Sequence, residues 1–512
     1  MKELIFFGDD AYIYDFPEDI KIFYAKEPLE PISNNEKAIR DAINNPIGSK
    51  KIQELVDKDS QIAICFDDIS VPLPPMKNEV RARAATVVLD LLTNLGVKKE
   101  NIFFICATGL HRKCTSKEFI HLLGKKIYKE FSEQIVNHDA SDEESLKSLA
   151  KMENGYEVKI NKLAAEADLI IYLNVTFTPL NGGWKSIIVG LGSYETIKPH
   201  HSPEILSEGS FMDPKNSGLH RIIWDMGEEI RNKIQVFTIE MVLNNNFFSG
   251  FFKKMYAPLK NNNNKPSLLQ KVLLSLAKIT PKFLKARMRK NLKADYGLIG
   301  IFAGDIEKAH NQSMNLLEKQ ILTPIDRQYD IIVYGAPNLT PYNVGAEMNP
   351  LLLHTLVLGY LYNMHKGISP LKKNGIIIVS NPAYEKFDTQ QHPSYKDFYY
   401  DILSSDLDMF SLKSEELVYR NNPTYISKYR SNFAYHGTHA FMVYYWGALG
   451  EKNVGEVIVS GAKNKDTLLN LGFRYASDLD EAIEMSRKKM GKNCAIAYFC
   501  IPPVFIGQVS KM

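Results

Sequence analysis

The feature that most constrains this fold is a repeated alternation of short apolar stretches with longer amphipathic ones. The predicted strands cover 61–66, 101–107 and 167–175 in the first half and 329–335, 375–380 and 456–460 in the second; the predicted helices cover 78–95, 116–131, 351–365 and 479–490. Strands that alternate with helices indicate an α/β protein with parallel sheets. Functional side chains in such sheets gather where the strands end at their carboxyl edge.

The length of the chain predicts more than one core. At 512 residues it exceeds the size of an ordinary single domain. We expect two domains, each with a mainly parallel sheet flanked by helices, and a cleft between them. The boundary is placed near residues 305–325, which gives an N-terminal domain at 1–310 and a C-terminal α/β domain at 311–512. No short-period repeat is present, which argues against a solenoid.

The composition excludes several classes of protein. A hydrophobic fraction of 45% with 24% charged residues is typical of a globular chain. No run approaches eighteen apolar residues, so we expect no spanning helix, and the first residues lack the features of a signal peptide. The five cysteines include no CxxC pair. This usage argues against a disulfide scaffold or a thiolate zinc site and favours a cytoplasmic location.

The segment 251–294 carries twelve Lys or Arg residues and no Asp or Glu. Because the whole chain has a net charge of +3, the other residues sum to about −9. Residues 267–279 have apolar side chains at helical spacing, which predicts a helical hairpin with solvated lysines. The alternative is a site for a membrane surface or another anionic partner, and hence a peripheral membrane location. Sparse aromatic residues make nucleic acid a less favoured partner.

Three predicted strand ends carry polar residues that suit chemistry. Asp68 follows the first strand, His111 follows the second, and Lys185 follows the third behind Gly182 and Gly183. Each alone could be a helix cap, a loop histidine or an ordinary turn. Together, a carboxylate, an imidazole and an amine at one sheet edge suit acid–base work on an anionic ligand. The glycine pair would let the backbone approach that ligand closely.

Other histidines leave alternatives open. His200 and His201 could supply a metal ligand or simply end a loop. His436 and His439, with Trp446 after them, could line the cleft from the second domain or be structural. The motifs GxxxxGK[ST], HExxH and GxSxG are absent, and no GxGxxG follows a strand. Nucleotide hydrolysis and ordinary NAD binding therefore lack support.

A series of motifs in fixed order resembles the nickel-dependent lactate racemase family, of which the chain would be a divergent member. The motifs are AINNPIGSKKIQELV (42–56), FDDISVPLP (66–74), ATGLHRKCTSKEF (107–119), VNHDASDEESL (136–146), NGGWKSIIVGLGSYETIKPHH (181–201), GIFAGDIEKAH (300–310) and the ending FRYASDLDEAIEMSRKKMGKNCAIAYFCIPP. The resemblance covers most of the chain outside 251–294.

The resemblance implies a two-domain isomerase with its active site in the cleft and a nickel pincer cofactor, pyridinium-3,5-bisthiocarboxylic acid mononucleotide, in the N-terminal domain. Lys185 would tether the cofactor and belong to the metal site, His201 would ligate nickel with His200 as the alternative, and Gly182, Gly183 and Asp68 would adjoin the cofactor. His111 and Asp68 would be the catalytic pair. Soft sulfur and imidazole ligands are reasonable for Ni(II).

The implied chemistry is racemisation or epimerisation of a small 2-hydroxy acid or related hydroxy compound. Hydride would pass from the carbinol carbon to the cofactor while a histidine takes the hydroxyl proton. Returning the hydride to the other face inverts the centre.

Departures from the family pattern temper this prediction. Val71 stands where the family motif DxTRP has its carboxylate-binding arginine, and 175–179 lacks the family's second catalytic histidine. The loop 337–350 offers Asn343, Glu347 and Asn349 but no lysine. We therefore expect the cofactor site to be retained more surely than lactate racemisation. The alternative is a non-catalytic relative that binds or delivers the cofactor or senses a metabolite.

Overall fold

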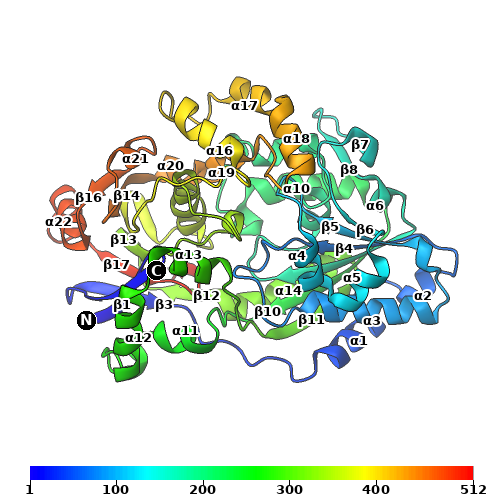
Figure 1. The fold of residues 1–512 in the computed structure, drawn as a ribbon, viewed down its shortest axis with the longest axis horizontal. Helices are drawn as coiled ribbons and strands as arrows, with labels where there is room; N and C mark the ends of the chain where they lie inside the picture. Colours follow the sequence, from blue (N-terminus) through cyan, green and yellow to red (C-terminus); the bar gives the residue numbers. More distant parts are fainter. Residues whose placement is uncertain (511–512) are drawn as a thin grey trace.

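The computed structural model describes residues 1–510 and contains two mainly parallel six-stranded sheets flanked by helices (Figure 1). The first sheet has the spatial order β11 (Leu298–Gly304), β10 (Val236–Leu243), β9 (Leu169–Thr176), β4 (Ile62–Asp67), β5 (Ile102–Ala107) and β6 (Ile135–Asn137). All its neighbours are parallel except β10 and β11. Every residue of β9 is buried, as expected for a central strand covered on both faces.

The second sheet is parallel throughout, with the order β16 (Arg474–Ala476), β15 (Val454–Ser460), β14 (Leu371–Ser380), β13 (Tyr329–Gly335), β17 (Ile496–Cys500) and β3 (Ile20–Tyr24). Three two-stranded sheets complete the β structure of residues 1–510: β1 (Lys2–Phe7) with β2 (Asp10–Asp15), β7 (Leu146–Lys151) with β8 (Glu157–Asn161), and β12 (Leu322–Ile325) with β18 (Ile506–Val509). The predicted fold class is therefore confirmed.

The helices fall into three groups. Those associated with the first sheet are α1 (Asn35–Asn44), α2 (Ile52–Leu55), α3 (Val80–Asn94), α4 (Ser116–Leu123), α5 (Lys125–Phe131), α6 (Lys162–Glu166), α7 (Trp184–Ile188), α8 (Tyr194–Ile197), α9 (Pro203–Leu206), α10 (Gly218–Ile230) and α14 (Ile306–Ile321). Those of the basic segment are α11 (Gly250–Met255), α12 (Leu268–Ile279) and α13 (Lys282–Lys290). Those that follow β13 are α15 (Pro350–His354), α16 (Pro393–Asp397), α17 (Lys413–Arg420), α18 (Pro423–Ser431), α19 (His439–Tyr445), α20 (Ala448–Asn453), α21 (Asp466–Leu469) and α22 (Leu479–Met490).

Two predicted helices are interrupted. The helix predicted over 116–131 is divided into α4 and α5 by Gly124, whose φ of +86° no L side chain adopts easily. The helix predicted over 351–365 begins as α15 and continues as a π-helical stretch, Thr355–Leu361. π-helical turns frequently occur at functional sites, and Leu356, Tyr360 and Leu361 of this stretch line the cavity described below.

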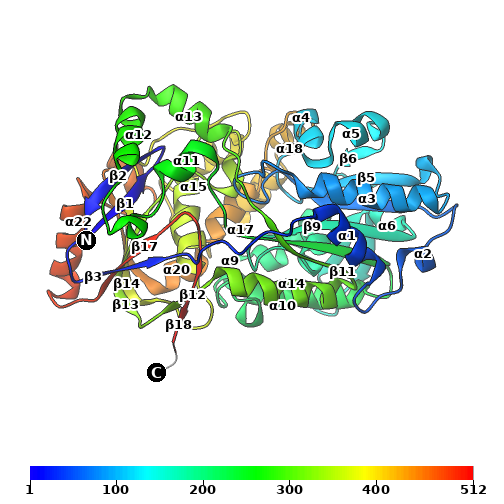
Figure 2. The same cartoon turned by 90° about the horizontal axis from the view of Figure 1, so that it is seen from below.

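The chain's first strands lie with the second sheet, not the first. Strand β3 pairs in parallel with β17, with Ile22 opposite Tyr498, and the two strands run side by side in Figure 2. Helix α14 instead packs on β10 of the first sheet and continues to residue 321. We therefore propose a division in which 1–24 and 322–510 form one unit and 25–321 the other, in place of the predicted boundary at residue 310.

The basic segment forms the predicted helical hairpin. Helices α12 and α13 lie beside β1 and β2 (Figure 2). Lys285 forms an ion pair with Asp10, and Arg289 pairs with Asp9 at 2.7 Å. Within residues 1–510, no helix combines the length and apolar character needed to cross a bilayer.

Candidate active site

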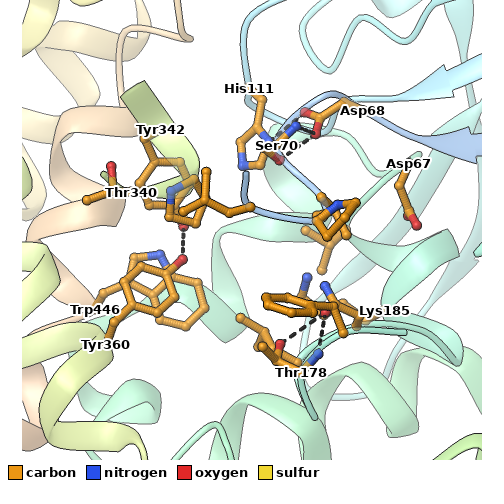
Figure 3. Close-up of a pocket in the computed structure, with 18 of the residues that line it drawn as sticks. Asp67, Asp68, Ser70, His111, Thr178, Lys185, Thr340, Tyr342, Tyr360 and Trp446 are labelled. Atoms are coloured by element: carbon orange, nitrogen blue, oxygen red, sulfur yellow. Dashed lines mark hydrogen bonds and ion pairs between the residues drawn. The ribbon is translucent and has the colours of Figure 1, made fainter. Parts of the chain in front are cut away.

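A cavity of about 220 Å³ lies at the carboxyl ends of the first sheet's strands and is closed by residues of the second unit (Figure 3). The first unit contributes Asp68, His111, Gly182, Lys185 and His201. The facing wall includes Thr340, Tyr342, Tyr360, His439 and Trp446. The residues predicted from three separate strand ends are thus brought together in one site.

Asp68 and His111 form a hydrogen-bonded pair at the ends of β4 and β5. The Nδ1 atom of His111 lies 2.8 Å from Asp68 Oδ2, and Asp68 Oδ1 accepts hydrogen bonds from the backbone N–H and hydroxyl of Ser70. Burial alone would raise the pKa of Asp68, but His111 and these bonds hold it below its ordinary value. An ionised Asp68 fixes the ring orientation of His111 and leaves its Nε2 as the atom available for proton transfer.

Lys185 is the only Lys or Arg among the described residues that line the cavity. Its ammonium group has no hydrogen-bond or ion-pair partner within residues 1–510, although Asp67 and Asp68 lie in the same wall. Desolvation lowers the pKa of Lys185, which increases the fraction of neutral, nucleophilic amine. Burial also raises the pKa of Asp67 to about 6, against the opposing effect of Arg81.

Of the two adjacent histidines, only His201 lines the cavity. His201 lines the cavity, with Nδ1 2.8 Å from His200 Nδ1 and 3.3 Å from the carbonyl oxygen of Ile197. Its remaining Nε2 is therefore the atom available to a ligand in the cavity. Burial lowers the pKa of His201 to about 3, so the imidazole is neutral at neutral pH, as metal binding requires. His200 is fully buried and lies outside the cavity lining.

The buried side chain of Glu240 supports the Gly182–Gly183 turn, a contact that the sequence did not predict. Glu240 on β10 is fully buried and accepts hydrogen bonds from the backbone N–H of Gly183 at 3.1 Å and the side chain of Asn174 at 2.7 Å. Thr176 and Ser313 also donate to it, and His310 Nδ1 lies 3.4 Å away. Burial would raise the pKa of Glu240, but His310 and these donors lower it.

The two glycines have a packing role in addition to the predicted one. Gly182 has φ +91°, and a Cβ there would lie 2.6 Å from Glu240 and 2.7 Å from His310. Gly183 has φ +58° and a similar contact with His310. Gly182 lines the cavity, whereas Gly183 does not. The turn therefore needs glycine to fit against Glu240 and His310 while it presents Lys185 to the cavity.

The second unit supplies aromatic and hydroxyl groups instead of the polar residues predicted for loop 337–350. Asn343 and Asn349 are buried and bond their own loop and the start of α15, and Glu347 pairs with Arg289 and Lys290. Thr340 and Tyr342 face the cavity instead, and the hydroxyls of Tyr342 and Tyr360 lie 2.8 Å apart (Figure 3).

Of the histidines at 436 and 439, only the second reaches the cavity. His436 bonds Ser141 and Thr438 and is structural. His439, at the start of α19, lines the cavity with its ring centroid 5.3 Å from that of His111. Its Nδ1 lies 2.6 Å from the hydroxyl of Tyr395, which leaves Nε2 without a hydrogen-bond partner in the described chain.

The departures from the family pattern are visible in the cavity wall. Val71, Phe177 and Thr178 all line it. The nearby Arg112 is buried and forms two hydrogen bonds with Glu118, at 2.6 and 3.0 Å, so it does not replace the missing arginine. Across residues 1–510, no three His, Cys, Asp or Glu side chains cluster with the spacing of a metal site.

Comparison with known proteins identifies the first part of the chain. Residues 7–213 match the family model described as the lactate racemase N-terminal domain. This part of the chain is therefore similar to the lactate racemase N-terminal domain. The family resemblance predicted from the motifs is thereby confirmed.

Two curated lactate racemases are similar to parts of the chain. The lactate racemase of Lactiplantibacillus plantarum is 30% identical over 219 residues, which are 41% of this chain and 48% of that protein. The lactate racemase of Thermoanaerobacterium thermosaccharolyticum is 28% identical over 267 residues, which are 49% of this chain and 59% of that protein. The chain thus matches about half the length of these relatives.

Solved structures extend the likeness in fold. The lactate racemase apoprotein from T. thermosaccharolyticum superposes with a TM-score of 0.63 and 19% identity, covering 100% of both chains. A protein from Thermotoga maritima has a TM-score of 0.50 and 15% identity, covering 95% of this chain and 100% of its own. At these identities the likeness shows a shared fold alone.

Proposed function

We propose that this lactate racemase relative is a racemase or epimerase of a 2-hydroxy acid or related hydroxy compound, and that it uses a nickel pincer nucleotide. The observation that carries the proposal is the presence of Lys185, His201 and the His111–Asp68 pair in one cavity. Asp68 and His111 follow strands β4 and β5, Lys185 lies in α7, and His201 lies in the short 3-10 helix after α8; the domain match covers all four residues.

The residues present fit the proposed cofactor. Lys185 has an unpartnered amine with a lowered pKa, which suits acylation by a thiocarboxylate, and His201 offers a neutral imidazole nitrogen. A cofactor that brings its own sulfur ligands needs only one protein ligand, which agrees with a site that has no three-residue cluster among the described side chains. When bound, the group would accept hydride from the carbinol carbon of the substrate and return it.

The protein's own part is to move the hydroxyl proton. His111 accepts it at Nε2, while Asp68 keeps the ring oriented through Nδ1. A racemase needs a second acceptor, because the hydroxyl groups of the two enantiomers do not occupy the same position. We assign this role to His439, whose Nε2 is free to accept a proton in the same cavity when its Nδ1–H donates to the hydroxyl of Tyr395. Burial and the neighbouring histidines lower the pKa of His439, which makes it a weak base.

The substrate carboxylate must be held without the usual arginine. Since Lys185 would be committed to the cofactor, we propose that neutral donors, the paired hydroxyls of Tyr342 and Tyr360, receive the carboxylate; the hydroxyl of Thr340 already donates to Asn343. Neutral donors bind a carboxylate more weakly than a bidentate arginine. The rest of the substrate must then contribute more of the affinity.

The test is nickel content and intact mass of protein from cells that make the pincer cofactor, beside Lys185→Ala. Stoichiometric nickel with an added mass that is absent from the variant supports the cofactor site. Conversion of single enantiomers of 2-hydroxy acids to racemates, followed by chiral chromatography, then tests the reaction. A folded protein with neither nickel nor adduct contradicts the proposal.

The alternative is a non-catalytic relative that binds or delivers the cofactor or senses a metabolite. The loss of the arginine at Val71 favours it. Loading of the cofactor without inversion of any 2-hydroxy acid in that screen would support it over the enzyme.

We also propose that the outer face of the hairpin binds an anionic membrane surface. Leu268, Ile279 and Phe283 are 70–80% exposed, and the lysines of α12 and α13 lie among them. Apolar side chains flanked by cations are the pattern of helices that adsorb to acidic lipid. Co-sedimentation with anionic vesicles should exceed that with neutral ones, and equal sedimentation would contradict it. The predicted cytoplasmic location stays a prediction.

A further inference from the structure

A second apolar chamber adjoins the catalytic cavity beneath the basic hairpin. It has a volume of about 220 Å³ and is enclosed by α11, α12, α13 and the first strand. Phe247, Pro337, Leu339 and Pro502 belong to the linings of both spaces and form the junction between them. The two spaces therefore adjoin at these four side chains, and an alkyl chain that reaches into both must pass between them.

The lining of the chamber suits a hydrocarbon group. Its wall consists mainly of aromatic and aliphatic side chains, among them Phe252, Met255 and Leu273. A preformed apolar space of about 150 Å³ already accommodates a benzene ring. At 220 Å³ this chamber has room for an alkyl chain of several carbons.

The charges at its edge are already neutralised. Lys285 pairs with Asp10, and Arg289 pairs with Asp9 and Glu347 while it donates to the carbonyl oxygen of Ala346. Both cationic side chains are nearly buried, at 10% and 7% exposure. The chamber therefore has no unpaired cation for a carboxylate within the described chain, and it suits the tail of a ligand whose polar head lies elsewhere.

The rim of the chamber exposes apolar side chains to solvent. Phe251, Leu276 and Met288 line it and are 40–53% exposed. Grouped apolar exposure of this kind marks a surface that a ligand or partner covers. The rim gives an alkyl chain a route into the chamber from the face of the hairpin.

We propose that the chamber binds the alkyl chain of a medium- or long-chain 2-hydroxy acid, with the carboxyl and hydroxyl groups in the catalytic cavity. The identity of the ligand as substrate rests on the proposed function, whereas its binding does not. The proposal also accounts for Val71: when the tail supplies the affinity, the head group no longer requires an arginine clamp.

The test is calorimetric titration of the cofactor-free protein with lactate, 2-hydroxyhexanoate and 2-hydroxydecanoate below their micelle concentrations. Affinity should rise roughly fourfold for each buried methylene until the chamber is full, with one site and a negative heat-capacity change. Affinity that does not depend on chain length would overturn the proposal.

Three variants, one of them a matched control, separate binding in the chamber from adsorption to the hairpin's surface. Ala277→Trp fills the chamber, so it should lower the affinity for 2-hydroxydecanoate by at least about tenfold and leave the affinity for lactate unchanged. Ser275→Trp, exposed on the same helix and outside the lining, is the matched control and should bind like the parent. Leu276→Glu places a charge at the half-exposed rim and should reproduce the loss without a change in folding. Equal binding by all four proteins would show surface adsorption and overturn the proposal.

The reaction is tested separately. Holoprotein should invert 2-hydroxydecanoate with a higher kcat/KM than lactate, and Ala277→Trp should remove this preference. Chain-dependent binding with inversion of lactate alone would overturn the assignment of the chain as substrate. Absence of nickel and adduct would instead refute the proposed function and leave the binding result unaffected.

Discussion

The imidazole rings of His111 and His439 come from different units of the fold, and their centroids lie 5.3 Å apart at the wall of one cavity. Each ring is held through Nδ1, by Asp68 and Tyr395 respectively, so both present Nε2 to the same space. Two oriented proton acceptors from opposite sides of a cleft are what a racemase of secondary alcohols requires.

His111→Gln and His439→Gln should each block proton removal from one enantiomer. Overall interconversion must fall equally in both directions, because the equilibrium constant of a racemisation is one. The difference appears in a single turnover of holoenzyme, in which the 2-oxo acid formed from each enantiomer is trapped and measured separately. His111→Gln should slow its formation from one enantiomer, and His439→Gln from the other, each by about 10²-fold or more. Equal loss from both enantiomers in His439→Gln would assign that residue to structure.

Asp68→Asn should keep the fold and lower kcat by about 10²–10⁴-fold. The amide no longer stabilises the imidazolium and permits the wrong ring tautomer of His111. The pH profile of kcat should shift with it, since the charge beside the imidazole is removed. Asp225→Asn, at an exposed position on α10, is the control and should leave kcat unchanged. A near-normal kcat for Asp68→Asn would exclude the orienting role.

Glu240→Ala should destabilise the protein by about 3 kcal/mol, because Asn174, Thr176 and Gly183 lose a buried acceptor. Urea unfolding measures the loss. Glu229→Ala, exposed on α10, should change stability by less than about 0.5 kcal/mol. Since Glu240 supports the turn before Lys185, the variant should also carry less of the cofactor adduct than the control. Unchanged stability would show that water satisfies these donors.

Stability should fall as the pH drops from 7 to 5, because buried histidines must stay neutral in the folded state. Burial lowers the pKa of His138 to about 4, and its Nε2 bonds the carbonyl oxygen of Gly192 at 2.9 Å. With an unfolded pKa near 6.5, the unfolded chain binds the proton first, so stability is present above pH 6.5 and is lost toward pH 4. This one residue should contribute about 2 kcal/mol of the loss between pH 7 and 5.

His138→Gln isolates that contribution by urea unfolding at the two pH values. The variant should lose about 2 kcal/mol less than the parent between pH 7 and 5. Asp67, whose pKa burial raises to about 6, acts in the opposite sense in this window, but it is common to both proteins and cancels in the comparison. An identical pH dependence in parent and variant would contradict the assignment.

The sequence predicted the parts of the site that follow from local pattern. A buried strand followed by a polar residue is a local signal, and it located Asp68, His111 and Lys185 correctly at one sheet edge. Glu240 was missed, although a single acidic residue within the apolar run VFTIEMVL was a usable sign, since a carboxylate inside a buried strand needs partners. The partners themselves come from β9, the Gly182–Gly183 turn and α14, and they have no local signature.

Long-range packing accounts for the rest of what was missed. Tyr342 reaches the cavity because the second unit closes over the first, which no periodicity encodes. For His439 the sequence left two alternatives open, a place in the cleft or a structural role, and only the packing of the two units decides between them. The apolar residues of α12 predicted an amphipathic helix, but the chamber beneath it depends on Phe6, Phe247 and Pro502 from three distant parts of the chain. The pairing of β3 with β17 joins residues more than 470 positions apart and left no sign in the order of strands and helices.

That pairing sets the order in which a nascent chain can mature. The first sheet uses strands up to residue 304 and can form while synthesis continues, whereas β3 must wait until β17 has left the ribosome. Ile501, Pro502 and Val504, which line the catalytic cavity, emerge only after β17. Any cofactor bound to Lys185 would thus be enclosed only after translation has passed residue 504. A chain that stalls earlier would expose Lys185 in a site that lacks the wall formed by Ile501, Pro502 and Val504.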